Sequence, residues 1–164
     1  MTTVLITHPA FLKHDTGQYH PERPDRMRAI DRILSHEIYN GLIRKEAPLR
    51  EDAQDAIQRV HPGRYYEDLE ARRPRPGQPS IYLDGDTVMS EGTWEAALRA
   101  VGAGLDAVDL VMSKQAANVF CQVRPPGHHA ESNVAMGFCL FSNAAIAAHY
   151  ARAKYGAERV AVVD

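Results

Sequence analysis

Hydrophobic positions along the 164-residue chain alternate between short continuous runs and stripes at helical spacing. Residues 4–7 are an apolar run that ends at a histidine and a proline, which predicts a buried strand. The histidine- and proline-containing segment 8–23 predicts a surface loop. Residues 24–41 begin with proline, end with glycine and repeat apolar side chains every three or four positions, which predicts a helix. A shorter helix is expected over 53–60.

The second half of the chain continues this alternation. Residues 94–112 carry the longest helical stripe, and Ser90-Glu91 before it predict a cap and an acidic first turn. A β-rich run at 118–123 is followed, after a loop, by an alanine-rich helical pattern over 138–155. The nearly continuous apolar run 159–163 is typical of a central parallel strand buried on both faces. Together these elements predict an α/β fold with a mostly parallel sheet.

Composition adds limits to this picture. With 45% hydrophobic and 24% charged residues, residues 1–164 are expected to form one globular domain. A net charge of −2 argues against binding nucleic acid through bulk positive charge. The sequence contains no apolar run of about 18 residues, so no membrane partner is expected. Two cysteines and the lack of a leader pattern predict a cytoplasmic protein.

The sharpest local feature is the segment Arg124-Pro-Pro-Gly-His-His-Ala130, which follows a predicted strand directly. It places His128 and His129 at the carboxyl end of that strand, the edge where parallel sheets bind ligands. Two prolines and a glycine restrict the backbone there. An imidazole titrates near neutral pH, so it can take a proton from water or give one to a leaving amine. The plainer alternative is an exposed histidine pair with no task.

Asp164 ends the predicted strand 159–163 and is expected at the same edge of the sheet. A carboxylate behind one of the two imidazoles would fix its tautomer and raise its basicity. Asp164 is therefore a candidate orienting group for His128 or His129. A carboxylate at a strand end is also commonplace without any such role.

The tandem-histidine segment, with Gly137-Phe-Cys-Leu-Phe-Ser-Asn143 after it, resembles the histone deacetylase superfamily. Tyr19-His-Pro-Glu-Arg-Pro24 and Leu83-Asp-Gly-Asp86 are also similar to that family. The resemblance covers essentially the whole chain and is nearest to the class II and bacterial amidohydrolase-like branch. It implies a three-layer arginase/deacetylase-like fold with a mostly parallel central sheet, truncated after a central strand.

The resemblance also implies roles for individual residues. His129 would be the general base and acid, and His128 its electrostatic and orienting partner. Gly137 and Phe138 would form the wall of a narrow tunnel for the acyl-lysine side chain. Asp84 would hold the substrate's backbone at the rim.

Four further residues have weaker assignments. Asp86 is a lesser candidate for the role of Asp84, and both could simply be turn residues. Arg26 would line an internal cavity, or else lie on a helix surface. His20 and Glu22 would lie in a loop that borders the entrance of the site, and no chemical role is assigned to them.

The family's metal centre is where this chain departs from the pattern. Zinc would polarise the acetamide carbonyl and activate water, but the resemblance places the zinc ligands beyond residue 164. Asp164 would match a residue behind the first histidine that also contributes to a monovalent-cation (K⁺) site. Cys121 and Cys139 are read as small hydrophobic residues. The remaining histidines show no common zinc-binding spacing: His8, His14, His20, His36, His61 and His149.

Three functions remain open from the sequence. The first is the amino-terminal portion of a zinc-dependent deacetylase acting on acetyl-lysine or an acetylated small amine, with residues 1–164 inactive alone. The second is a non-catalytic fragment that forms a homo-oligomer or docks to a missing carboxyl-terminal half. The third is a manganese hydrolase of the arginase kind, which would need clustered Asp and His ligands.

Overall fold

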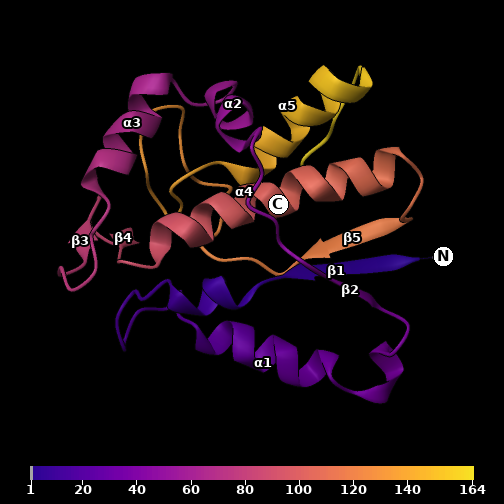
Figure 1. Ribbon diagram of the computed structural model, residues 1–164, viewed down its shortest axis with the longest axis horizontal. Coiled ribbons are helices and arrows are strands. Elements are labelled where there is room, and N and C mark those ends of the chain that lie inside the picture. Colours follow the sequence, from indigo (N-terminus) through magenta and orange to yellow (C-terminus); the bar gives the residue numbers. More distant parts are fainter. Residues whose placement is uncertain (1) are drawn as a thin grey trace.

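A three-stranded parallel sheet lies at the centre of the computed structural model, which describes residues 2–164 (Figure 1). Its strands are, in spatial order, β2 (Ile43–Glu46), β1 (Thr3–Thr7) and β5 (Asn118–Cys121). In the middle strand, Val4 lies opposite Ile43 on one side and Val119 on the other. The predicted strands at 4–7 and 118–123 are therefore confirmed and adjacent.

Helices cover both faces of this sheet. The helices of the chain are α1 (Asp25–Leu34), α2 (Ala53–Gln58), α3 (Gly63–Arg72), α4 (Thr93–Met112) and α5 (Asn143–Tyr155), of which α2 packs against α3, α4 and α5 rather than on the sheet. The remaining elements are the 3₁₀ turns η1 (Pro9–Lys13) and η2 (Glu37–Tyr39) and the antiparallel pair β3 (Ile81–Tyr82) and β4 (Val88–Met89). α1 lies on one face of the sheet, and α4 and α5 lie on the other (Figure 1). The predicted three-layer α/β fold with a mostly parallel sheet is confirmed.

The helix predicted over 24–41 ends earlier than its apolar spacing suggested. α1 stops at Leu34, and the N–H of Ser35 closes the last turn on Asp31. The next residue, His36, is extended and its side chain accepts a hydrogen bond from Ile38, which starts the separate turn η2. A side-chain cap thus divides one apolar pattern into two elements.

The helix predicted to start at residue 138 begins at Asn143 instead. Gly137 and Phe138 have φ values of 56° and 69°, which a right-handed helix cannot include. The predicted end is confirmed, because Gly156 adopts φ 67° and closes the helix on Ala151 and Arg152.

The start of α4 also differs from its predicted cap. Gly92, rather than Ser90, is the residue at the helix boundary. The Ser90 hydroxyl instead accepts the N–H of Asp15 at 2.9 Å, and the Ser90 N–H donates to Thr93 Oγ1 at 2.8 Å. The serine therefore ties the loop after η1 to the helix rather than capping it.

The apolar run Arg159–Val163 is not a strand in this structure. Its residues are exposed, and Val163 is 93% exposed. A central parallel strand needs a paired neighbour and cover on both faces, and no strand of the described residues pairs with this run. The predicted central strand is therefore not formed here.

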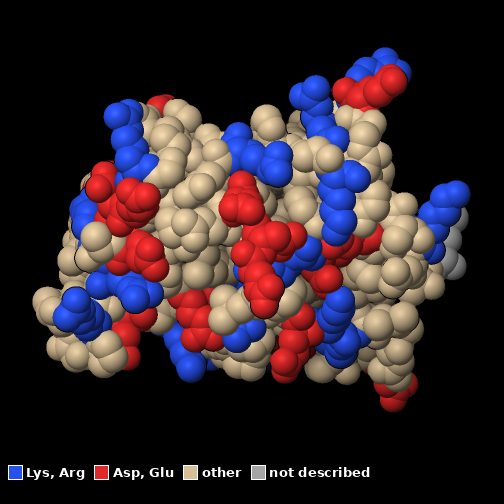
Figure 2. Space-filling model, turned by 45° about the horizontal axis from the view of Figure 1, so that its top comes forward, with Lys and Arg blue, Asp and Glu red and all other residues tan. Residues whose placement is uncertain are grey.

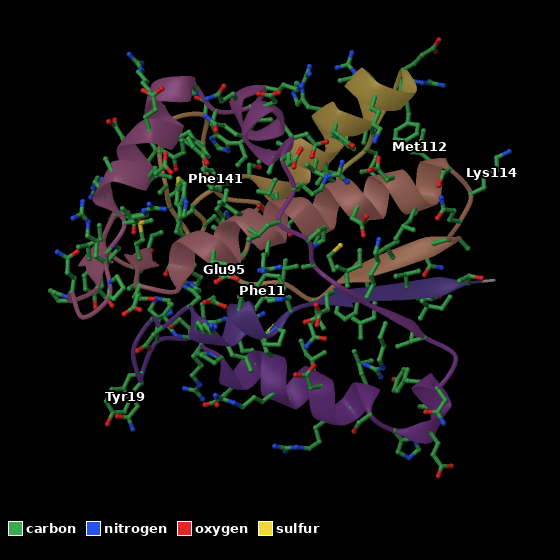
Figure 3. The ribbon with its side chains drawn as sticks, in the orientation of Figure 1. Phe11, Tyr19, Glu95, Met112, Lys114 and Phe141 are labelled. Carbon is green, nitrogen blue, oxygen red and sulfur yellow. The ribbon has the colours of Figure 1, made fainter. Side chains whose placement is uncertain are left out.

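The helix α4 separates two buried clusters. One joins α2, α3, α4 and α5 around the aromatic rings of Tyr66, Trp94 and Phe141. The other lies between α4, the sheet and η1, and contains Phe11. Figure 3 shows Phe141 and Phe11 on opposite sides of α4. The segment α3, which the sequence reading missed, contributes Tyr66 to the first cluster.

Candidate active site at the end of strand β5

The tandem histidines lie just beyond β5, as the sequence predicted. The ring centroids of His128 and His129 are 4.1 Å apart, with the planes tilted by 47°. The preceding Gly127 packs against the start of α5: its carbonyl accepts the N–H of Ala144 at 3.0 Å, and a Cβ there would lie 2.3 Å from the Asn143 side chain. Only glycine fits this approach, so the loop is held close to the helix.

The carboxylate of Asp164 contacts His128, the first histidine of the tandem pair. Its Oδ1 lies 3.1 Å from Nδ1 of His128, although the side chains are 73% and 41% exposed. A neutral imidazole that donates from Nδ1 to a carboxylate keeps Nε2 as an acceptor. The predicted pairing of the carboxylate with one imidazole is therefore present in the structure.

The two histidines open onto a surface pocket of about 420 Å³. The pocket is lined by Pro21, Glu22, Arg26, Pro126, His128, His129, Gly137 and Phe138. Four residues from the predicted site, both histidines with Gly137 and Phe138, thus meet in one cavity, and Arg26 joins them. Asp84 does not belong to the lining.

The pocket wall is shaped by two residues with positive φ. Gly137 lies against the ring of His129, since a Cβ on the glycine would approach its Cγ and Cδ2 to 2.8 Å. The N–H of Phe138 donates to Thr87 Oγ1 at 3.0 Å, and its ring meets His20 edge-on at 4.8 Å. Thr87, in the loop from α3 to α4, and His20, in the loop before α1, therefore hold the wall in place.

Asp84 stabilises a turn in the loop from α3 to α4. Its Oδ1 accepts the N–H groups of Asp86 at 2.9 Å and of Thr87 at 2.6 Å, which shapes the turn between β3 and β4. Partial burial would raise the pKa of Asp84, but these hydrogen bonds outweigh it and lower the pKa. Asp86 binds His20 through its carbonyl, at 2.9 Å from Nε2. A substrate-holding role for Asp84 stays a prediction.

Glu22, to which the sequence assigned no chemistry, is almost completely buried at the pocket. Its carboxylate accepts two hydrogen bonds from Arg124, at 2.6 and 2.8 Å. Burial by itself would raise the pKa of Glu22, but the contacts with His14 and Arg124 outweigh it and lower the pKa to about 2. Glu22 and Arg124 each lie in a motif that the sequence analysis singled out. Nothing in the sequence indicated that the two motifs contact each other.

The described residues do not fit a zinc centre. No group of three or more His, Cys, Asp or Glu side chains in residues 2–164 is arranged to hold a metal ion, and a catalytic zinc needs three protein ligands. Burial raises the pKa of the Cys121 thiol to about 11, so it stays protonated. The Cys139 thiol is buried and donates to the carbonyl of Gly137.

Comparison with known proteins identifies the family. Residues 20–164 match the histone deacetylase domain. The chain is 42% identical to the uncharacterized protein slr0245 of Synechocystis over 98% of its length, and 32% identical to a probable deacetylase of Archaeoglobus fulgidus over all of it. The crystal structure of the HDA15 HD domain superposes with a TM-score of 0.83 at 32% identity, over 93% of this chain and 43% of that one.

The protein therefore belongs to the histone deacetylase domain family. Its chain spans 52% of the Synechocystis relative and 45% of the Archaeoglobus one, about half of each.

Proposed function

We propose that this chain supplies the proton-transfer part of a deacetylase site, which removes acetyl groups from acetyl-lysine or from an acetylated small amine. The observation that carries the proposal is the tandem pair itself. Two imidazoles lie 4.1 Å apart at the pocket, and one of them is bonded to a carboxylate. An exposed pair without a task would not need this partner or the close packing of Gly127 and Gly137.

His129 is the proton carrier in this proposal. A water oxygen attacks the acetamide carbon and gives its proton to the imidazole of His129. The carbon–nitrogen bond then breaks, the departing amine takes the proton, and acetate remains. His128, with Nδ1–H held on Asp164, stabilises the charge that passes through its neighbour.

The lining of the pocket supports the proposed substrate class. Phe138 and the two prolines of its lining, Pro21 and Pro126, give it apolar walls. Such walls suit the aliphatic stem of an acylated amine, while the acetamide lies against the histidines. Acetyl-lysine and acetylated diamines share this stem, so both are substrates to be tested.

Zinc dependence belongs to the proposal only for a longer polypeptide. The described residues do not fit a zinc site. We propose that the zinc ligands come from the half of the domain that the relatives have and this chain does not span. Asp164 would also contribute to a K⁺ site there.

The second candidate function is that of a non-catalytic fragment. An apolar groove of about 430 Å³ between α4, β5 and α5 favours it, because such a surface suits a homo-oligomer or a carboxyl-terminal half. Light scattering distinguishes the readings: a stable monomer without dye-binding apolar surface would count against the fragment.

We also propose a cytoplasmic location without a nucleic-acid partner. Both cysteines are free thiols, which suits a reducing compartment. Figure 2 shows acidic and basic side chains intermingled on the face in view rather than gathered into a basic patch. No helix in residues 2–164 has the length and apolar character needed to cross a bilayer.

The test of the proposed function is a fusion of residues 1–164 to the carboxyl-terminal half of the Synechocystis relative, loaded with zinc. Acetate release is measured with an acetyl-lysine peptide and with an N-acetylated diamine. We expect His129→Ala to slow release by about 10²- to 10⁴-fold. The matched control is His149→Ala, since His149 is exposed on α5. An active fusion whose His129→Ala variant keeps its rate would contradict the proposal.

A further inference from the structure

We propose that Glu22 is a positioning residue for the tandem histidines and acts through Arg124; this inference rests on the proposed function. Arg124 is 1% exposed and stands four positions before His128. Glu22 is 2% exposed and lies 102 positions earlier in the chain. Their bidentate contact joins the loop before α1 to the segment that carries both imidazoles.

The guanidinium of Arg124 has no freedom to turn. Its Nε and Nη2 donate to the two carboxylate oxygens of Glu22, at 2.6 and 2.8 Å. Nη1 donates to the carbonyls of Phe11 at 2.7 Å and His14 at 3.0 Å, and Nη2 reaches the carbonyl of Glu22 at 3.4 Å. All five N–H groups of the fork therefore have acceptors. Any rotation would leave a buried donor unpaired.

Glu22 is the anionic partner that balances this buried cation. The other groups that face its carboxylate are His14, whose Nε2 lies 3.4 Å away, and the exposed Arg26, whose Nη1 also lies at 3.4 Å. His20 contacts the Glu22 backbone only. Burial lowers the pKa of His14 more than its contact with Glu22 raises it, so His14 is neutral near pH 7. The carboxylate thus stands between two arginines.

The connection from Arg124 to the histidines is short and stiff. Only Pro125, Pro126 and Gly127 intervene, and each proline fixes its own φ. Gly127 is wedged against Asn143 at the other end. Because these three residues have little conformational freedom, the loop cannot absorb a displacement of Arg124. Such a displacement would therefore shift the imidazoles as well.

The experiment is NMR of the 164-residue chain, which needs no activity. In the wild type we expect ring-to-ring NOEs between His128 and His129 and an Nδ1 shift of His128 typical of a donor to carboxylate. Glu22→Gln, which removes the charge at constant shape, should lose both signals. The indole N–H resonance of Trp94, in the core around Phe141, should stay and report an intact fold. The control Glu95→Gln breaks a partly exposed ion pair with Arg99 instead and should keep every signal.

A folded Glu22→Gln variant that keeps the imidazole signals would overturn the proposal. If that variant unfolds, Arg124→Lys takes its place, because lysine keeps the charge without the fork. A folded Arg124→Lys chain without the signals supports positioning, and one that keeps them overturns it. If both variants unfold, the ion pair between Glu22 and Arg124 serves folding only, and the proposal is overturned. The His129→Ala activity test bears on the proposed function alone, so the two failures are distinguishable.

Discussion

A Cβ atom on Gly137 would lie 2.7 Å from the Cβ of His129. The backbone of the glycine forms the surface on which this imidazole rests, and its φ of 56° is itself costly for any residue with a side chain.

We predict that Gly137→Ala displaces His129 and destabilises the chain by about 1–3 kcal/mol, from strain and contact together. Urea unfolding measures the stability, and NMR of the histidine rings measures the displacement. The control is Gly85→Ala, because Gly85 has no neighbouring atom within 4 Å of a Cβ and no positive φ. Equal stability of the two variants would show that the approach to His129 is relaxed in solution.

The pairing of Asp164 with His128 predicts a change in rate without a change in stability. The carboxylate is 73% exposed, so Asp164→Asn should alter the free energy of unfolding by less than about 0.5 kcal/mol. Loss of the orienting charge should lower kcat of the fusion about 10- to 100-fold. A variant with an unchanged kcat would show that the pairing has no part in catalysis.

Acid should weaken the fold through Glu22. Its pKa falls from 4.5 to about 2 on folding, so the ionised carboxylate stabilises the native state above pH 4.5. That stability is lost as the pH falls from about 4.5 towards 2, and its full size is on the order of 3 kcal/mol. Urea unfolding between pH 7 and 3 measures the larger part of this loss. In Glu22→Gln the same curve should be flatter, and an identical slope would contradict the assignment.

His61 predicts a second loss of stability, at milder acidity. It is fully buried; Nδ1 lies 3.0 Å from the carbonyl of Ser132, and Nε2 accepts the N–H of Ser142 at 3.0 Å. Burial lowers its pKa from 6.5, so the unfolded chain takes up the proton first and stability falls as the pH drops below about 6.5.

Thermal unfolding above and below pH 6.5 measures this loss, and substitution of His61 tests the contacts that hold the residue. His61→Ala leaves two buried polar groups unpaired and a cavity between Tyr65 and Phe141, and should cost about 3 kcal/mol. Thermal unfolding measures it against His149→Ala, which should differ from wild type by less than about 0.5 kcal/mol. A His61→Ala chain as stable as that control would show that the loop from Ser132 to Ser142 does not need this anchor.

Local patterns were sufficient for the elements that the core requires. The apolar run of β1 and the stripe of α4 could be read from spacing, since each must bury one continuous surface. Boundaries failed where a side chain or a positive φ intervened, as at His36 and Phe138. The hydrophobic pattern does not record such local hydrogen bonds and backbone angles.

The sequence by itself determined that two histidines stand in a stiff loop at a strand end, because prolines, glycine and strand are contiguous there. Only the tertiary structure decided which distant groups hold them: Asp164 on His128, 36 positions away, and Glu22 on Arg124, 102 positions away. A carboxylate's partner depends on which loops the sheet and helices bring to one edge. Packing of the whole chain sets that proximity, and no local spacing encodes it.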